Sequence, residues 1–269
     1  MTPRSPSTTG ALGVFGGTFN PIHIGHLRAA EEIVEALGLS RMLFIPSARP
    51  PHKAVQGVDT IAPAAERLAW VRLAIQDNPR FAVDPIEVER AGPSFLVDTL
   101  RAIGQRTAPQ RPVFVVGRDA FQELGQWREP RRLFELAHFA VVTRPPLQDG
   151  TLADWLPECA RDDVELAEDG LSALHRSAGT WLRLVAITAL DVSASAIRKR
   201  LRDGRSTRYL MPDAVERAVV ASGCYLPASE KGSSDPASGG DPEQSSSQST
   251  DSPERPNDPQ KPRAQELPA

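Results

Sequence analysis

Along residues 12–226, short apolar runs alternate with segments whose apolar residues recur every three or four positions. The runs are rich in Val, Ile, Leu and Phe, which predicts strands that are buried on both faces of a parallel sheet. The predicted strands are Leu12–Phe15, Met42–Ile45, Val113–Val116, Phe139–Thr143 and Leu182–Ile187. The predicted helices are His26–Leu37, Ala64–Ile75, Phe95–Gly104, Ala120–Leu124, Ala194–Arg202 and Ala214–Ser222. Three of these helices are predicted to end at Gly38, Gly104 and Gly223.

This alternation predicts an α/β fold: a Rossmann-like doubly wound parallel sheet of about five strands with helices on both faces. One domain is expected over residues 12–226, with an irregular insertion at 144–180 and a disordered N-terminus at 1–11. Residues 227–269 hold eight of the 25 prolines, eight acidic and four basic side chains, and one large aliphatic residue, Leu267. Because such a segment buries too little apolar surface to offset chain ordering, we predict a disordered acidic Ser/Pro-rich tail.

Charge and composition exclude several classes of protein. The formal net charge of −3 argues against a general nucleic-acid-binding protein, whose phosphate contacts need a basic excess. No window approaches the roughly 18 apolar residues of a membrane span, and residues 1–11 lack the apolar core of a signal peptide. Cys159 and Cys224 are too far apart to form a metal-ligand pair, and free thiols suit a reducing compartment. We therefore expect a cytoplasmic protein without membrane or nucleic-acid partners, and homo-oligomer formation stays open.

The first candidate site follows the first predicted strand. Gly16 and Gly17 allow a sharp turn and a close approach of a ligand to the main chain. The next helix presents N–H groups at its start, and His23 and His26, three positions apart, can face one ligand. These features predict a phosphate site. The alternatives are a tight turn with capping or surface histidines, and a zinc site, for which third and fourth ligands are missing nearby.

A second candidate site lies after the last predicted strand, where Ser193 and Ser195 precede Arg198 at a helix start. Hydroxyl groups and a guanidinium suit a polyphosphate. The alternative is a serine N-cap on a basic surface helix. Since ligands of open α/β sheets bind beyond the carboxyl ends of the strands, the two segments together favour a nucleotide site.

These segments resemble known signatures. Gly16-Gly17-Thr18-Phe19-Asn20-Pro21 followed by His23-Ile24-Gly25-His26 is similar to the nucleotidyltransferase signature that class I aminoacyl-tRNA synthetases share in part. Ser193–Arg198 is similar to the second signature of small-molecule adenylyltransferases. Further segments, in the family's order, resemble the bacterial nicotinate-nucleotide adenylyltransferases: Pro50–Lys53, Glu89–Leu100, Gly117–Asp119, Trp127 and Thr143–Pro145.

The chain also departs from the pattern of this family. Asn20 stands where many members have Asp, which is expected to matter little at a turn. Ala194 and Ser195 replace the commoner Ser and Thr, so one hydroxyl contact to phosphate is in doubt. Arg118 replaces a small residue and is expected to alter the rim of the nucleotide pocket.

The resemblance implies an enzyme that transfers the adenylyl group of ATP to nicotinate mononucleotide, with Mg²⁺ bound mainly through the ATP phosphates. It implies catalytic roles for His23, His26 and Arg198, and no metal ligand from the protein. Residues implied to bind ATP are Gly16, Gly17, Thr18, Phe19, Lys53, Gly117, Asp119, Ser193, Ser195 and Ile197. Residues implied to bind nicotinate mononucleotide are Ser94, Asp98, Thr99, Trp127 and Arg144.

Alternatives remain at the level of single residues and of function. Trp127 can fill core instead of stacking on the pyridine ring, Asp98 and Thr99 can cap a helix or face solvent, and Asp119 can be a helix N-cap. A class I tRNA synthetase would need a Lys-rich second signature and tRNA-binding domains, which the sequence lacks. A pantetheine-phosphate adenylyltransferase or a cytidylyltransferase would use a different acceptor. A catalytically inactive nucleotide sensor would use the tail to recruit a partner.

Overall fold

A computed structural model of the chain describes residues 10–48, 61–143, 150–188 and 190–226. The chain divides into two units, residues 1–231 and 232–269, and every described residue belongs to the first. The predictions for residues 1–9, Lys53, Arg144 and the tail 227–269 therefore lie outside the described residues.

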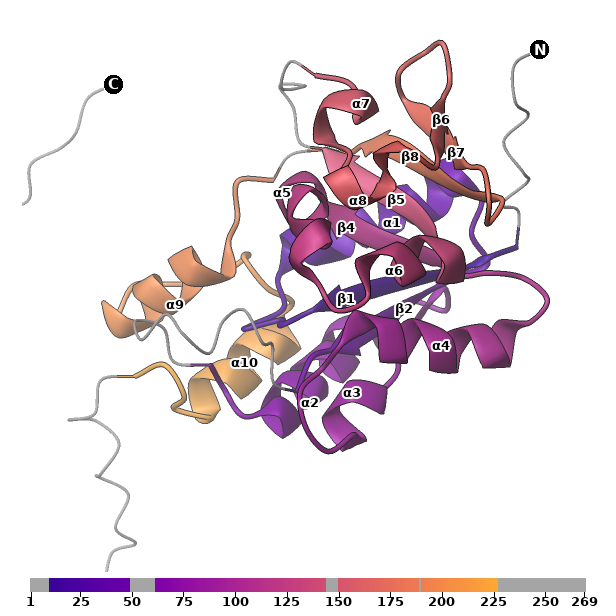
Figure 1. Cartoon of the computed structure of the whole chain (residues 1–269). Helices are drawn as coiled ribbons and strands as arrows, with labels where there is room; N and C mark the ends of the chain where they lie inside the picture. Colours follow the sequence, from indigo (N-terminus) through magenta and orange to yellow (C-terminus); the bar gives the residue numbers. More distant parts are fainter. Residues whose placement is uncertain (1–9, 49–60, 144–149, 189, 227–269) are drawn as a thin grey trace, which may run out of the picture. The chain divides into compact units, whose positions relative to one another are not determined.

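A mixed sheet of eight strands runs through the described unit in the order β3-β2-β1-β4-β5-β8-β7-β6, with helices on both of its faces (Figure 1). The first six strands in this order, β3 to β8, pair in parallel. The last two are antiparallel: β7 pairs with β8, and β6 pairs with β7. The strands are β1 (Leu12–Gly17), β2 (Arg41–Pro46), β3 (Phe81–Val83), β4 (Val113–Gly117), β5 (His138–Thr143), β6 (Val164–Leu166), β7 (Ser172–His175) and β8 (Thr180–Ala186). The predicted Rossmann-like α/β class is confirmed, and the predicted number of about five strands is wrong.

The three strands that the pattern missed are short and lie at the two edges of the sheet. β3 has three half-buried residues, too few for a periodic signal. β6 and β7 contain polar residues and lie in the segment for which an irregular insertion was expected. That expectation is wrong for residues 150–180, which form two short helices and these two strands. Edge strands need only one apolar face, so their sequences lack the continuous Val, Ile and Leu content of the central strands.

Most long helices occupy the predicted segments. They are α1 (Ile24–Leu37), α2 (Ala64–Ile75), α4 (Leu96–Thr107), α9 (Ala194–Arg202) and α10 (Asp213–Ala221). The shorter ones are α3 (Ile86–Glu89), α5 (Arg118–Gln122), the 3₁₀ turn η1 (Glu123–Gln126), α6 (Pro130–Leu136), α7 (Leu152–Trp155) and α8 (Glu158–Arg161). Gly38 ends α1 in the left-handed conformation, with φ of 61°, as predicted. The prediction that Gly104 ends a helix is wrong, because α4 continues through it to Thr107.

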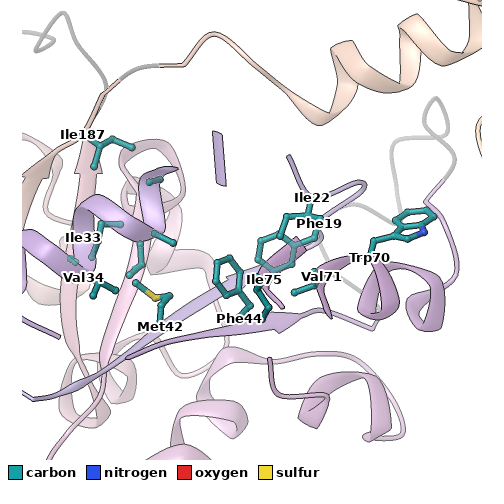
Figure 2. Close-up of a cluster of buried hydrophobic side chains, with 14 of the residues drawn as sticks. Phe19, Ile22, Ile33, Val34, Met42, Phe44, Trp70, Val71, Ile75 and Ile187 are labelled. Carbon is teal, nitrogen blue, oxygen red and sulfur yellow. The ribbon is translucent and has the colours of Figure 1, made fainter. Parts of the chain in front are cut away.

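Successive residues of the central strands point to opposite faces and form two cores. On one face α1, α2, α9 and α10 pack against β2, β4 and β8, and on the other α4, α5, α6 and α7 pack against the same sheet. The first core also includes two residues from the loop after β1: Phe19 and Ile22 lie near Phe44, Val71 and Ile75 (Figure 2). This apolar packing anchors the loop on the core.

The strand register brings the ends of the central strands to one edge. Gly17 at the end of β1 pairs with Pro46 at the end of β2, and Gly117 at the end of β4 pairs with Val142 near the end of β5. In parallel α/β sheets this carboxyl edge is where ligands bind. The segments that the sequence analysis singled out after β1 and β4 therefore lie at the same edge of the sheet.

His138, at the start of β5, gives the fold a predicted pH dependence. Its ring stacks on Trp181 at 4.8 Å, and its Nδ1 accepts a hydrogen bond of 3.1 Å from the main-chain N–H of Trp181. Burial, aided by the charge of Arg111, lowers the pKa of His138 from 6.5 to about 4. The unfolded chain therefore takes up a proton below pH 6.5 that the folded chain does not bind until about pH 4.

We expect His138 to lower the free energy of unfolding by about 2 kcal/mol between pH 7 and pH 5. Urea denaturation at both pH values measures this, with His138→Gln as the control, because Gln does not titrate. A wild type whose loss of stability over this range equals that of His138→Gln would contradict the prediction.

Candidate active site

The loop between β1 and α1 is shaped by one glycine and one aromatic ring. A Cβ on Gly17 would lie 2.9 Å from the ring of Phe19, so the ring can fold back over the main chain only because residue 17 is a glycine. Phe19 itself has a φ of 46°, in the region that side chains other than glycine rarely adopt. Gly16 is less restricted, since a Cβ there would be 3.5 Å from Phe114. The turn predicted at Gly16-Gly17 is wrong, because both glycines belong to β1 and pair with Ile45 and Pro46 of β2.

His23 and His26 lie together at the start of α1. His23 is the N-cap residue, is 5% exposed, and stacks on the ring of His26 with 3.7 Å between ring centroids. The main-chain N–H of His23 donates to Nδ1 of His26 at 3.2 Å. In a neutral His26 the proton is then on Nε2, which can only donate. The two histidines therefore cap α1, as the capping alternative predicted. The same hydrogen bond on Nδ1 of His26 leaves Nε2–H as its donor.

The structure brings the second signature next to this loop. Arg198 of α9 is 5% exposed, and its Nη1 donates to the main-chain oxygen of Asn20 at 2.7 Å. Its Nη2 donates to Oγ of Ser195 at 3.0 Å. Ser193 is the N-cap of α9 and accepts a hydrogen bond from the N–H of Ala196, as the capping alternative predicted. The two candidate sites, 178 residues apart in sequence, therefore form one site.

Ile197 has a different position from its neighbours in the signature. Its side chain is fully buried in the first core, and its N–H donates to the main-chain oxygen of Ser193. The structure therefore gives the Ile197 side chain a packing role that holds α9 on the core.

Gly117 and Asp119 line a hollow at the ends of β4 and β5. Its volume is about 500 Å³, and its walls are Gly117, Arg118, Asp119, Ala120, Val142, Thr143 and Trp155. Gly117 is the N-cap of α5, so the alternative that Asp119 caps this helix is wrong. Asp119 instead accepts a hydrogen bond of 2.9 Å from Arg118, whose guanidinium lies 5.5 Å from the Trp155 ring. Arg118 is thus held at the wall of the hollow by a carboxylate and an aromatic face.

The residues proposed for the second nucleotide surround a buried carboxyl group. Oγ1 of Thr99 donates to Oε1 of Glu87 at 2.7 Å and accepts from Arg90 at 3.3 Å. Burial raises the pKa of Glu87, against the opposing effects of hydrogen bonds from Thr99 and Ser94 and of the Arg90 charge. Because Thr99 is 1% exposed, the alternative that it faces solvent is wrong.

The neighbouring residues of this group are nearer the surface. Ser94 accepts a hydrogen bond of 3.0 Å from the N–H of Ala48, which follows β2. The Asp98 side chain is 38% exposed and pairs with Arg101 at 3.2 Å. Trp127, after η1, is half-buried against the second core, so it combines core packing with an accessible part of its ring.

The sequence analysis missed a buried polar cluster beneath the loop after β1. Asn20, which was expected to matter little, accepts hydrogen bonds through Oδ1 from the N–H of Ala62 and from the hydroxyl of Tyr225. Arg67 of α2 donates to the main-chain oxygen of Thr18 at 2.7 Å. A signal for Arg67 was present, because it lies three and four positions before the buried residues Trp70 and Val71 on one helix face.

Within the residues that the structure describes, no group of three or more His, Cys, Asp or Glu side chains is arranged to hold a metal ion. Imidazole, hydroxyl and guanidinium groups favour phosphate oxygens instead. Likewise, no helix in the described ranges has the length and apolar character that crossing a membrane requires.

This fold and site define a class of nucleotide-transferring proteins. The sequence model of the family described as cytidylyltransferase-like matches residues 14–200. A probable nicotinate-nucleotide adenylyltransferase of Chromohalobacter salexigens is 43% identical over 219 residues, which cover 80% of this chain and 95% of the relative. One of Geobacter sulfurreducens is 42% identical over 215 residues, covering 79% and 97%. The chain therefore belongs to the nicotinate-nucleotide adenylyltransferase family.

Solved structures agree on the fold. A nicotinic acid mononucleotide adenylyltransferase of Plasmodium falciparum, complexed with NaAD, matches with a TM-score of 0.59 and 14% identity. The match covers 80% of this chain and 97% of that chain.

The hydrogen bond from Tyr225 to Asn20 yields a prediction for stability. Burial raises the pKa of Tyr225, so the hydroxyl stays protonated and donates to Oδ1 of Asn20 throughout the neutral range. We expect Tyr225→Phe to lower the free energy of unfolding by about 1–2 kcal/mol, since it leaves a buried acceptor with one donor fewer. Urea denaturation measures this. Tyr209→Phe is the matched control, because Tyr209 is 75% exposed and its change should stay within about 0.5 kcal/mol. Equal effects of the two substitutions would contradict the role of Asn20.

Proposed function

We propose that this protein transfers the adenylyl group of ATP to nicotinate mononucleotide, giving nicotinate adenine dinucleotide and pyrophosphate, a step of NAD biosynthesis. One observation carries the proposal: Arg198 of the second nucleotide signature donates directly to the main chain of the first signature at Asn20. Relatives of about 40% identity that align over nearly their whole length bear the corresponding name. The absence of a membrane-spanning helix among the described residues is compatible with the cytoplasmic location that we propose.

The reaction needs no general base from the protein. The nucleophile is an oxygen of the 5′-phosphate of nicotinate mononucleotide, whose second pKa near 6 leaves it largely dianionic at neutral pH. This oxygen attacks the α-phosphorus of ATP, the bond from that phosphorus to the α,β-bridging oxygen breaks, and pyrophosphate leaves with the electron pair. Catalysis then consists of aligning two anions and stabilising the charge that develops on pyrophosphate.

The loop after β1 and the start of α1 hold the reacting phosphates in this proposal. Main-chain groups of Gly16, Gly17, Thr18 and Phe19 approach the α-phosphate, and the imidazoles of His23 and His26 donate to its oxygens. The main-chain cap on Nδ1 of His26 supports the second role, because it leaves Nε2–H as the donating atom. The rings of His23 and His26 stack on each other, so each restricts the orientation of the other.

The start of α9 serves the leaving group. Ser193, Ser195 and Arg198 bind the β- and γ-phosphates, and Lys53 adds charge from a segment outside the described residues. Arg198 also holds the loop after β1 in place, because its Nη1 donates to the main-chain oxygen of Asn20. Hydrogen bonds to Asn20 and to Ser195 thus preorganise the Arg198 guanidinium beside the Ser195 hydroxyl that we propose to bind the same phosphates.

The two nucleosides are assigned to different groups of residues. The hollow at Gly117 and Asp119 receives the adenosine, with the Asp119 carboxylate accepting from a ribose hydroxyl. The buried hydroxyl of Thr143, without a hydrogen-bond partner among the described residues, supports a polar ligand there. Asp98 and Trp127 contact the nicotinate nucleotide, Arg144 adds charge, and Ser94 and Thr99 shape its pocket through Ala48 and Glu87.

In this mechanism Mg²⁺ is bound by the substrate ATP. It retains water and prefers phosphate oxygens, so we expect it to arrive with the triphosphate and to neutralise charge there. The imidazoles, hydroxyls and guanidinium of the site are suited to the phosphate oxygens that the metal leaves uncovered.

His26→Ala tests the proposed role of the histidine pair. Removing a donor to the reacting phosphate should lower kcat by a factor of about 100–1,000. The lost cap should lower the free energy of unfolding by only about 1 kcal/mol. Initial rates of pyrophosphate release measure the first effect and urea denaturation the second. Glu35→Ala is the control, since Glu35 is exposed on the same helix. A turnover number of His26→Ala near that of the wild type would remove His26 from the mechanism.

Pyrophosphate release with ATP and Mg²⁺ tests the function itself. Nicotinate mononucleotide, nicotinamide mononucleotide and phosphopantetheine are compared as acceptors, and we expect the highest kcat/KM with the nicotinate form. Preference for phosphopantetheine would keep the phosphate site but overturn the assignment of the acceptor pocket. No release with any acceptor, together with loss of a binding partner on deletion of residues 227–269, would favour a nucleotide sensor.

A further inference from the structure

Arg67 is the most buried guanidinium of the described chain outside the two signatures. It lies in α2, is 1% exposed, and makes three hydrogen bonds, each to a main-chain oxygen. Nη1 donates to Thr18 at 2.7 Å, Nη2 to Ala48 at 3.1 Å, and Nε to Ala62 at 2.9 Å. A single side chain thus connects the loop after β1, the segment after β2 and the start of its own helix.

The contact with Thr18 fixes the orientation of one peptide group. In a trans peptide the C=O of one residue and the N–H of the next point to opposite sides. The peptide between Thr18 and Phe19 is trans, since the cis bonds of the described chain are at Pro21 and Pro109. Because Arg67 draws the Thr18 oxygen toward α2, the N–H of Phe19 is directed away from α2. Phe19 is one of the residues whose main chain we propose to bind phosphate.

The contact with Ala48 extends this effect to the acceptor side. The N–H of Ala48 donates to Oγ of Ser94, and its oxygen accepts from Arg67, so Ala48 is held on both sides. Ser94 belongs to the pocket proposed for nicotinate mononucleotide, whereas Thr18 belongs to the loop proposed for ATP. Arg67 therefore bridges the two halves of the site through one rigid, planar group.

The positive charge of Arg67 also favours the binding of phosphate at the loop. Its three contacts are to carbonyl oxygens, so within the described chain its charge is balanced by dipoles and not by a carboxylate. Burial lowers the pKa of this guanidinium, but an arginine side chain stays protonated at neutral pH. A buried positive charge behind the loop favours a polyanion in front of it, because screening by water is weak there.

We infer that Arg67 is a positioning residue for the transfer reaction: it orients the Thr18–Phe19 peptide toward the phosphates and fixes the spacing between the ATP loop and the acceptor wall at Ala48. This inference rests on the proposed function. Arg67 contacts main-chain atoms only, so it acts through the loop. Its loss should lower kcat more than it raises either KM, because misalignment of the reacting atoms impairs the chemical step.

The test compares Arg67→Gln and Arg67→Lys with two controls on the same helix. Leu68→Ala removes buried apolar atoms of the same helix, and Leu68 lies outside the core cluster that holds Phe19 and Ile22 of the loop. Arg72→Gln removes an exposed arginine. Steady-state kcat and both KM values are measured on the full chain at a temperature where circular dichroism finds every variant folded, and melting temperatures are recorded in parallel.

We expect kcat to fall at least 30-fold in Arg67→Gln and at least 5-fold in Arg67→Lys, because an ammonium group cannot span three carbonyl oxygens. Leu68→Ala should lower the melting temperature yet keep kcat within 3-fold of wild type, and Arg72→Gln should change neither. A folded Arg67→Gln with kcat within 3-fold of Leu68→Ala would overturn the inference. If Arg67→Gln does not fold, Arg67→Lys decides alone by its 5-fold threshold.

A second readout separates this inference from the proposed function. The affinity of wild type and Arg67→Lys for α,β-methylene-ATP, a non-hydrolysable analogue that carries the α-phosphate, is measured with Mg²⁺ by calorimetry, which needs no turnover. At least 3-fold weaker binding in Arg67→Lys supports the role of Arg67 even if no acceptor reacts. Equal binding with an inactive wild type would overturn both proposals, as would a wild type that neither turns over nor binds the analogue.

Discussion

The buried hydrogen bond from Arg198 to the main-chain oxygen of Asn20 joins the last helical signature of the domain to its first loop. A guanidinium taken out of water must find acceptors, and a loop without strand or helix pairing must find donors. Here the guanidinium of Arg198 finds its acceptor in the loop, and the loop oxygen of Asn20 finds its donor in Arg198. The same logic applies to Arg67, which donates to Thr18, and to Tyr225, which donates to the side chain of Asn20. The conformation of the loop after β1 depends on these three long-range donors.

The direction of these hydrogen bonds has a functional consequence. Arg67 binds the carbonyl oxygen of Thr18 from the side of α2, which leaves the N–H of Phe19 on the opposite side of the Thr18–Phe19 peptide. Apolar packing of Phe19 and Ile22 keeps the loop seated on that core (Figure 2). A surface lined with donors and backed by buried positive charge is suited to phosphate, and binding there need not reorganise the loop.

The acceptor side is built in a similar way around an acidic group. Glu87 is buried and accepts from Thr99, and Arg90 donates to Thr99 in turn, so a small polar network lies behind the helix that carries Asp98. At the other end of the site, Trp155 of α7 supports Arg118 beside the hollow at Gly117. The segment after β5 thereby contributes to the wall of this hollow, and its strands β7 and β6 extend the sheet beyond β8.

The sequence by itself determined the features that depend on neighbouring residues: the buried parallel strands, the long amphipathic helices, and the Gly-Gly and His-x-x-His segments at a strand end. Periodicity and chain stereochemistry are local, so they are visible in a few consecutive positions. The tertiary structure alone decided what depends on distant partners. β3, β6 and β7 are too short to carry a signal and form because an existing sheet offers them an edge. Asn20 accepts two hydrogen bonds from distant residues, and Arg67 donates to the loop after β1. The partners in these hydrogen bonds are 42 to 205 positions apart, so they meet only when whole helices pack on the sheet.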